Sequence, residues 1–274
     1  MNASLTVSAA LAKSGLVPIE GKILLAHTLG CDRAWLVAHG DATLSKAQTA
    51  SFDGLIRRRH NGEPIAYLTG RREFVGLDLE ITPDVLIPRP ETELLVELAL
   101  ERIDARAEIH ILDLGCGSGA IALAIAQQRQ HARVIGVDVS PQAVALARRN
   151  AARLRIANVE FMHSDWFGQV PRQAFTLIVS NPPYVADVDP HLGEGDLRFE
   201  PSIALKGGLD GLTAIRAIVL QAPMHLAPQG LLLIEHGYDQ ADRVQALLRD
   251  AGFGAVESRR DLAGILRVTL GRVA

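Results

Sequence analysis

Ile109-His110-Ile111-Leu112-Asp113-Leu114-Gly115-Cys116-Gly117-Ser118-Gly119 is an apolar run that ends in a glycine-rich turn. The run predicts a buried strand over Ile109–Leu114, and the apolar pattern behind the turn predicts a helix over Ala120–Arg129. Glycines between a strand and a helix permit a sharp turn and let a ligand approach the backbone closely. This order of elements is typical of an α/β domain that binds a nucleotide-like ligand.

The next strand, predicted over Arg133–Asp138, supplies a carboxylate at its tip. Asp138 lies 19 residues after Gly119, and a carboxylate in that place can accept hydrogen bonds from both hydroxyls of a ribose. The same glycines, with Ala120, also fit the dinucleotide fingerprint, so an NAD-dependent dehydrogenase stays open as an alternative. The residues that we expect to bind the cofactor here are Gly115, Cys116, Gly117, Ser118, Gly119 and Asp138.

Two neighbours of this turn have more than one interpretation. Asp113 could either anchor the turn or contact the amino group of the ligand through water. Cys116 fits better as a small loop residue than as a nucleophile. Beyond the third predicted strand, Asp165 and Trp166 could hold an adenine by a hydrogen bond and by stacking. A hydrophobic lid over the ligand is an equally plausible role for Trp166.

From Glu91 onward the chain alternates helices with apolar strands, which predicts a mostly parallel sheet covered on both faces. The last two strands are joined by a short turn and predict an antiparallel hairpin at one edge of the sheet. The remaining helices are expected over Glu91–Arg102, Pro141–Leu154, Leu212–Met224 and Gln240–Arg249, and the remaining strands over Val159–His163, Phe175–Ser180, Gly230–Glu235, Gly254–Arg259 and Ile265–Leu270.

The first part of the chain differs in character. Residues 1–70 predict a small all-helical domain, and residues 71–90 a linker whose alternating pattern over Glu73–Ile81 is that of an exposed β-hairpin. Residues 91–274 then form the α/β domain. The helical segments are expected over Ser4–Lys13, from Pro18 to just before Gly30, over Trp35–His39 and over Ser45–Arg59, with Ser45 as the N-cap.

Composition argues against several other classes of protein. A formal net charge of −3 over 274 residues fits poorly with a protein that depends mainly on phosphate contacts. Two cysteines make no disulfide framework, and no cysteines and histidines have the spacing of metal ligands, so we expect no metal. Without a signal peptide or an apolar run of roughly 20 residues, we expect a cytoplasmic protein that does not bind membranes.

Asn181-Pro182-Pro183-Tyr184 follows the fourth predicted strand and indicates the chemistry. A planar amide or aryl amine is a poor nucleophile because its lone pair is delocalised. The Asn181 side-chain carbonyl and the Pro182 main-chain carbonyl can accept both N–H groups, which orients the nitrogen for in-line attack on an activated methyl group. Pro183 stiffens the turn and Tyr184 offers a flat face to the substrate. This interpretation assigns catalysis to Asn181, Pro182 and Tyr184, and substrate binding to all four residues.

Taken together, these motifs resemble class I methyltransferases that act on nitrogen. Further motifs resemble the release-factor glutamine methyltransferase family (HemK/PrmC) in particular. These motifs are Gly62–Gly70 with Phe74, Leu86–Glu93, Phe199-Glu200-Pro201 and Gly207–Leu212, so the resemblance covers nearly the whole chain, including the N-terminal helical domain.

The resemblance implies a class I methyltransferase fold and S-adenosyl-L-methionine as cofactor. It implies N5-methylation of the glutamine in the Gly-Gly-Gln motif of class 1 peptide chain release factors. Cofactor contacts would come from Gly115–Gly119, Asp138, Trp166 and Asn181. A DNA adenine-N6 methyltransferase uses the same four-residue motif, but it needs a recognition domain and a basic cleft. The small helical domain and the net charge fit that alternative poorly, so we expect no stable nucleic-acid binding.

Overall fold

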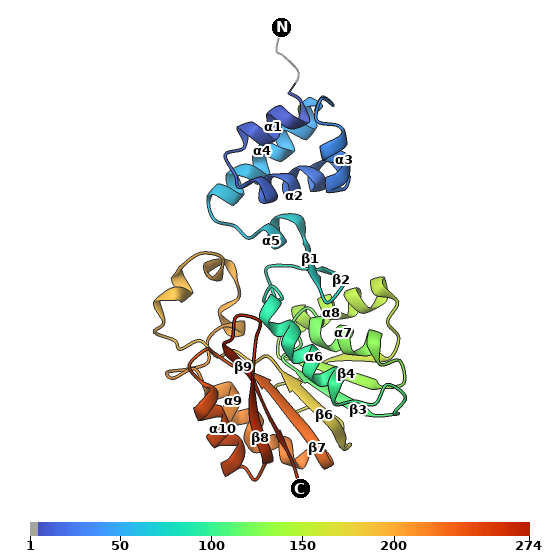
Figure 1. Ribbon diagram of the computed structural model, residues 1–274, viewed down its shortest axis with the longest axis vertical. Helices are drawn as coiled ribbons and strands as arrows, with labels where there is room; N and C mark the ends of the chain where they lie inside the picture. Colours follow the sequence, from blue (N-terminus) through green and yellow to red (C-terminus); the bar gives the residue numbers. More distant parts are fainter. Residues whose placement is uncertain (1–4) are drawn as a thin grey trace. The chain divides into compact units, whose positions relative to one another are not determined.

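The computed structural model describes residues 5–274, which form two compact units (Figure 1). The smaller unit extends to Arg71 and also includes Glu194–Phe199. The larger unit comprises Arg72–Gly193 and Glu200–Ala274. Ser4, the first residue of the first predicted helix, lies outside the described residues.

The smaller unit is helical, as its sequence predicts. Two of its helices begin where a side chain caps them: Thr6 accepts from the backbone N–H of Ala9, and Ser45 forms a capping box with Gln48. The first helix therefore begins at Val7. The helices are α1 (Val7–Lys13), α2 (Pro18–Leu29), α3 (Arg33–Ala38), α4 (Lys46–His60) and α5 (Ile65–Thr69), and their shared core includes Leu24, Leu25, Leu36, Phe52 and Leu68.

The segment Glu194–Phe199 was not predicted to join this unit. Arg59 donates to Glu20 at 2.7 Å and also contacts Asp196, with 3.4 Å between Nη1 and Oδ1. Arg198 donates to the main-chain carbonyl of Asn61. The contacts with Asp196 and Arg198 join residues that are 137 positions apart in the sequence, which no local pattern reveals.

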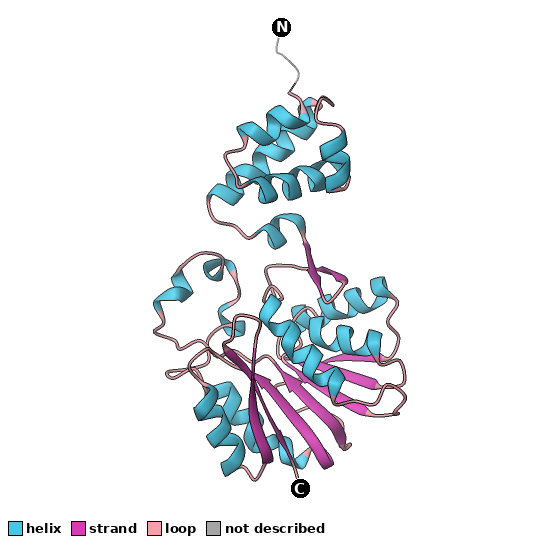
Figure 2. Cartoon of the chain, viewed as in Figure 1, coloured by secondary structure: helices cyan, strands magenta, loops and turns pink. Residues whose placement is uncertain are grey.

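The larger unit contains one twisted seven-stranded sheet (Figure 2). Its strand order is β5-β4-β3-β6-β7-β9-β8, in which β3 to β7 are parallel and β9 and β8 antiparallel. The predicted fold class is therefore confirmed, including the C-terminal hairpin at one edge. The strands are β3 (His110–Leu114), β4 (Arg133–Asp138), β5 (Val159–His163), β6 (Phe175–Ser180), β7 (Leu226–Glu235), β8 (Gly254–Arg260) and β9 (Leu266–Arg272).

Helices cover both faces of this sheet. Figure 1 shows α6 (Glu93–Glu101), α7 (Ala120–Gln128) and α8 (Pro141–Leu154) on one side, and α9 (Thr213–Gln221) and α10 (Ala241–Asp250) on the other. Successive strand residues point to opposite faces, so both faces of the central strands are apolar. On the α9–α10 side, the core includes Leu112, Val137, Ile178, Ile215, Leu232, Val244 and Leu248.

The hairpin of β1 (Arg71–Phe74) and β2 (Leu77–Glu80) forms as predicted, but the expectation that it is exposed was wrong. Phe74, Leu77 and Leu79 are at most 1% exposed. Asn150 on α8 binds β2 through its side chain: Oδ1 accepts from Glu80 N at 2.8 Å and Nδ2 donates to Glu80 O at 3.0 Å. Nδ2 also donates to Ser118 O at 3.0 Å, which ties the hairpin to the glycine-rich turn.

Within residues 5–274, no helix combines the length and the apolar character that crossing a membrane requires.

Substitution of Asn150 tests this connection. Asn150→Ala removes three hydrogen bonds of a buried side chain and leaves Glu80 and Ser118 groups without these partners, so we expect the free energy of unfolding to fall by about 2–4 kcal/mol. Urea unfolding followed by circular dichroism measures the change. Gln127→Ala, at an exposed position of α7, is the control and should change stability by less than about 0.5 kcal/mol. Equal stability of the two variants would contradict the assigned role.

Candidate active site

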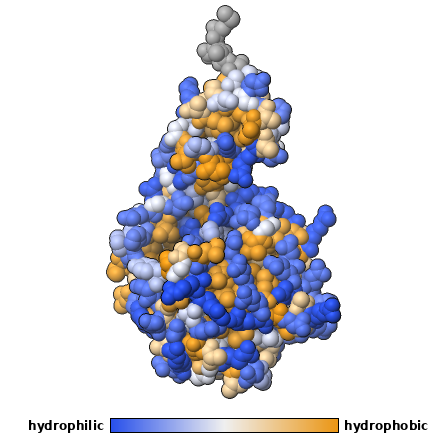
Figure 3. Space-filling model, in the orientation of Figure 1, coloured by the Kyte–Doolittle hydropathy of each residue, from blue (hydrophilic) through white to orange (hydrophobic). Residues whose placement is uncertain are grey.

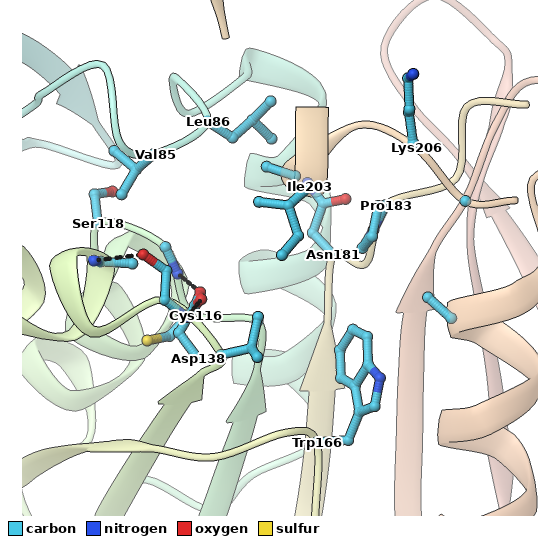
Figure 4. A pocket seen from close by; sticks show the side chains of 18 of the residues that line it. Val85, Leu86, Cys116, Ser118, Asp138, Trp166, Asn181, Pro183, Ile203 and Lys206 are labelled. Carbon is cyan, nitrogen blue, oxygen red and sulfur yellow. Dashed lines mark hydrogen bonds between the residues drawn. The ribbon is translucent and has the colours of Figure 1, made fainter. Parts of the chain in front are cut away.

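A cavity of about 410 Å³ lies where β3, β4, β5 and β6 end, within the size range of ligand pockets in proteins. In a parallel sheet such a crevice forms where neighbouring strands connect in opposite directions, and here that place is between β3 and β6. Figure 4 shows Ser118, Cys116 and Asp138 on one side of the cavity, and Asn181, Pro183 and Trp166 on the other. The parallel sheet thus collects side chains that are far apart in the sequence.

The glycine-rich turn requires its glycines. Gly115, Gly117 and Gly119 all have positive φ, between 54° and 84°. At Gly119 space is also limiting, because a Cβ atom there would lie 2.8 Å from Cζ of Phe161. The turn can therefore bring backbone N–H groups to the cavity while α7 packs closely on the sheet.

Asp138 is fixed in place by this turn. Its Oδ2 accepts from Gly117 N and its Oδ1 from Ser140 N, both at 2.9 Å (Figure 4). Burial raises the pKa of Asp138, while these backbone hydrogen bonds oppose the shift. Each carboxylate oxygen retains a second lone pair, so this side chain can accept two hydroxyl donors from a ligand in the cavity.

For Asp113, the structure favours the interpretation as an anchor. Asp113 does not line the cavity; its side chain is buried in β3, and Oδ2 accepts from Ala122 N at 3.1 Å in the first turn of α7. Oδ1 has no partner among the described residues, and burial raises the pKa of Asp113 to about 7. Cys116 lines the cavity, but burial raises the pKa of its thiol well above the ordinary value, which agrees with a loop residue and not a nucleophile.

Asp165 and Trp166 both line the cavity, as residues after β5. Trp166 has a φ of 44°, and two hydrogen bonds of Ser164 stabilise this conformation: Ser164 Oγ donates to Trp166 O at 2.8 Å and accepts from Gln169 N at 2.9 Å. The indole is therefore placed by the backbone turn, and its position beside Gly115 leaves it available as one wall of the cavity.

The Asn181–Tyr184 motif is divided between the cavity and the core. Asn181 and Pro183 line the cavity, whereas Pro182 and Tyr184 are not among the lining residues. Asn181 Nδ2 donates to Thr92 Oγ1 at 3.1 Å. The Tyr184 ring packs against the core, and its hydroxyl donates to Glu235 Oε1 at 3.2 Å. The structure thus brings Asn181 and Pro183 to the side chains that would hold a cofactor, and places the Tyr184 hydroxyl on a buried carboxylate.

A glycine-containing loop supports this motif from behind. A Cβ atom at Gly207 would lie 2.7 Å from Pro183 O, and one at Gly211 would lie 2.3 Å from Tyr184 O. Gln240 adds a hydrogen bond from Nε2 to Tyr184 O at 3.0 Å. Glycines are needed here because the loop lies directly on the backbone of the motif.

Sequence reasoning missed two residues near this motif. Thr92 lines the cavity and accepts from Asn181, and Glu235 is the last residue of β7 and is 1% exposed. The rule that identified Asp138, a carboxylate at the tip of a parallel strand, also applies to Glu235 and could have found it.

In the linker, Arg89 pairs with the buried side chain of Glu200, which gives Arg89 a structural role.

No group of three or more metal-ligating side chains occurs in the described part of the chain.

Family models match a segment of each unit, and curated relatives match nearly the whole chain. Residues 91–193 match the family model described as Methyltransferase small domain, and residues 5–70 match the model described as PrmC N-terminal domain. The chain is 53% identical to a release factor glutamine methyltransferase of Burkholderia pseudomallei, over 98% of this chain and 96% of that protein. It is 50% identical to one of Xylella fastidiosa, over 93% and 92% of the two chains.

Among solved structures, the chain is similar to a 16S rRNA N2 G1207 methyltransferase of T. Thermophilus, with a TM-score of 0.55 and 22% identity. The similarity covers 74% of this chain and 50% of that one, and it concerns the fold alone.

The anchor role of Asp113 predicts a particular dependence of stability on pH. Its folded-state pKa of about 7 exceeds the ordinary 3.8, so the folded protein binds a proton more readily than the unfolded chain. The resulting stability is present at low pH and is lost as the pH rises from about 4 to about 7. Asp113→Asn keeps an acceptor for Ala122 N–H and cannot ionise, so we expect a shallower fall in the free energy of unfolding over this range.

Urea unfolding at about pH 5, 6 and 7 measures this slope. Asp53→Asn, at an exposed position of α4, is the matched control and should leave the slope unchanged. A slope that is as steep in Asp113→Asn as in the wild type would contradict the prediction.

Proposed function

Since this chain belongs to the release factor glutamine methyltransferase family, we propose that it methylates the glutamine of the Gly-Gly-Gln motif in class 1 peptide chain release factors. The methyl group of S-adenosyl-L-methionine is transferred to the N5 amide nitrogen, and the modified factor supports translation termination. The observation that carries this proposal is the position of Asn181 and Pro183 in the same cavity as Asp138 and the glycine-rich turn.

The residues of the cavity fit the cofactor. Asp138 offers two anchored acceptor oxygens for the ribose hydroxyls, and Trp166 offers an aromatic wall beside Asp165 for the adenine. Gly115, Gly117 and Gly119 have no side chain, so the ligand can approach the backbone of this turn closely. When bound, S-adenosyl-L-methionine supplies an electrophilic methyl group on a sulfonium. The chain must therefore position the acceptor nitrogen, and it does not need to activate the donor.

Asn181 is suited to hold the acceptor amide. Its Nδ2 is engaged by Thr92, so its Oδ1 remains as an acceptor for a substrate N–H. The main-chain carbonyl of Pro182 provides the second acceptor in this proposal, and the proline ring fixes its direction. Two acceptors on one amide nitrogen restrict its rotation and stabilise the positive charge that develops as the methyl group arrives.

We also propose that residues 1–70 form a substrate-recognition domain, joined by the linker 71–90 to the methyltransferase domain 91–274. In support, the helical unit exposes apolar side chains, among them Val17, Ile19 and Val37 at 51–72% exposure. The loop after the Asn181–Tyr184 motif exposes Val188 and Leu209 in the same way. Figure 3 shows apolar residues among hydrophilic ones on one face of the molecule.

Transfer of radiolabel from S-adenosyl-L-methionine tests the acceptor. Three acceptors are compared: an intact release factor, a free peptide that contains Gly-Gly-Gln, and duplex DNA. We expect rapid labelling of the intact factor, labelling of the peptide that is slower by about 100-fold or more because it lacks the surface that orients the glutamine, and no labelling of DNA.

Each of the other outcomes contradicts one part of the proposal. Label in DNA would replace the protein substrate with adenine. A peptide methylated as efficiently as the intact factor would remove the role of the helical domain in recognition. A release factor whose Gly-Gly-Gln glutamine is replaced by alanine is the control for the site of modification.

Substitutions should separate cofactor binding from transfer. Asn181→Ala removes an acceptor that is needed in the transition state, so we expect kcat to fall by about 100-fold or more while the Kd of the cofactor changes only a few-fold. Asp138→Ala should weaken cofactor binding by at least about 10-fold, because both ribose contacts are lost. Isothermal titration calorimetry and single-turnover assays measure the two quantities. Equal turnover by wild type and Asn181→Ala would overturn the assigned mechanism.

A further inference from the structure

Glu235 is a buried carboxylate to which the reaction above gives no role. It is the last residue of β7 and follows the strand direction toward the same sheet edge as Asn181, which comes directly after the neighbouring strand β6. It does not line the cavity, so it cannot touch a substrate there. Its surroundings, however, connect it to both ends of the Asn181–Tyr184 motif.

The contacts form a short polar network. Asn181 Nδ2 donates to Thr92 Oγ1 at 3.1 Å, and the Tyr184 hydroxyl donates to Glu235 Oε1 at 3.2 Å. Glu235 Oε2 is buried and has no hydrogen-bond partner among the described residues. The Thr92 side chain is among the groups that favour the charged form of this carboxylate. Thr92 therefore links Asn181, through a hydrogen bond, to the surroundings of Glu235.

Hydrogen-bond directions in this network depend on the charge of Glu235. An ionised carboxylate only accepts, so it favours a Thr92 hydroxyl whose proton faces Glu235 and whose oxygen accepts from Asn181 Nδ2, as the 3.1 Å contact with Asn181 requires. Asn181 then keeps Oδ1 for the substrate. A protonated Glu235 can donate instead, which frees the Thr92 proton for Asn181 Oδ1. The Asn181 amide could then turn over and present its NH₂ group to the substrate NH₂ group, where neither can accept.

We propose that Glu235 is a positioning residue for methyl transfer: its carboxylate sets, through the Thr92 hydroxyl, which end of the Asn181 amide faces the acceptor, and it holds Tyr184 by the phenol. This inference deepens the proposed function and rests on it. It also assigns Thr92 as the relay between the carboxylate and the motif.

Burial and the neighbouring groups bring the pKa of Glu235 close to neutral pH. Burial raises the pKa of Glu235 to about 7, and Glu91 adds to the rise, whereas Thr92, Tyr184 and Arg267 oppose it. These groups come from the 3-10 turn Pro90–Thr92 before α6, from the motif and from β9, and Arg267 is itself paired with Asp261 at 3.2 Å. The ionised form is the one that orients Asn181, so kcat should rise as the pH increases through about 7 and fall as the pH decreases through it.

If Glu235 had a purely structural role, its replacement would lower stability; a positioning role predicts loss of activity without loss of stability. Burying a carboxylate costs stability, so replacing it by a neutral group of the same shape should leave the folded state as stable or more stable at pH 8. Glu235→Gln keeps the size of the side chain but introduces an NH₂ group that donates to Thr92. We therefore expect Glu235→Gln to fold with an unchanged or higher Tm and to lose activity.

The experiment measures single-turnover methylation of an intact release factor at saturating cofactor from about pH 5.5 to 9. Relative to wild type at pH 8, Glu235→Gln should be slower by about 10–100-fold with a cofactor Kd that changes less than about 3-fold. The acidic limb near pH 7 should be absent. In Tyr184→Phe that limb should move to higher pH, because the phenol that favours the charged carboxylate is gone.

Thr92 provides the matched pair. Thr92→Val removes the hydroxyl at nearly constant shape and should reduce the rate as Glu235→Gln does. Thr92→Ser keeps the hydroxyl and should retain most of the wild-type rate. The double variant Glu235→Gln/Thr92→Val should be no slower than about the slower single variant, because both act through the same relay.

Two outcomes would overturn the inference. One is a wild-type rate and an unshifted acidic limb in Glu235→Gln; the other is additive loss in the double variant. Failure of the proposed function looks different: the wild type itself would then label another acceptor and not the release factor. In that case, the same variants would be compared on the acceptor that is labelled.

Discussion

The parallel pairing of β3 with both β4 and β6 is the constraint on which this molecule depends. β3 is central, and the chain adds strands first on one side of it and later on the other. The two sets of connections therefore leave the sheet in opposite directions and open a crevice at its carboxyl edge. The glycine-rich turn lies on one wall of the crevice, and the motif that follows β6 lies on the other. Register between these strands fixes the distance between the two walls, so the geometry of the cavity is a property of the sheet.

This constraint also explains how much the sequence could reveal. The apolar runs predicted β3, β4 and β6 almost to the residue, because a strand that is buried on both faces has a strong continuous signal. Ser45 located the start of α4 because capping is local. The fold class and the candidate residues of the cavity wall followed from these elements.

Other features depend on contacts between distant residues and left no local signal. Pairing of Arg59 with Asp196 draws Glu194–Phe199 into the helical unit, and nothing in the surrounding sequence indicates it. The alternation of the hairpin distinguishes an apolar side from a polar one, but the hydrogen bonds of Asn150 to its edge come from a helix about 70 residues later, which no local pattern reveals. The placement of Tyr184 could not be predicted either, since a carboxylate that is 51 residues away determines where its hydroxyl points.

Three carboxylates of the sheet show how the same chemical group acquires three roles. Asp138 receives two backbone N–H groups and remains at the cavity, so it can bind a ligand. Asp113 receives one and is enclosed, so it anchors α7 and has a pKa of about 7. Glu235 accepts from the Tyr184 hydroxyl and from no backbone N–H among the described residues, so, apart from burial, its charge depends on neighbouring side chains. Burial raises the pKa of all three carboxylates, and the number and kind of their hydrogen-bond donors then distinguish a binding group from an anchor and from a group whose ionisation can orient its neighbours.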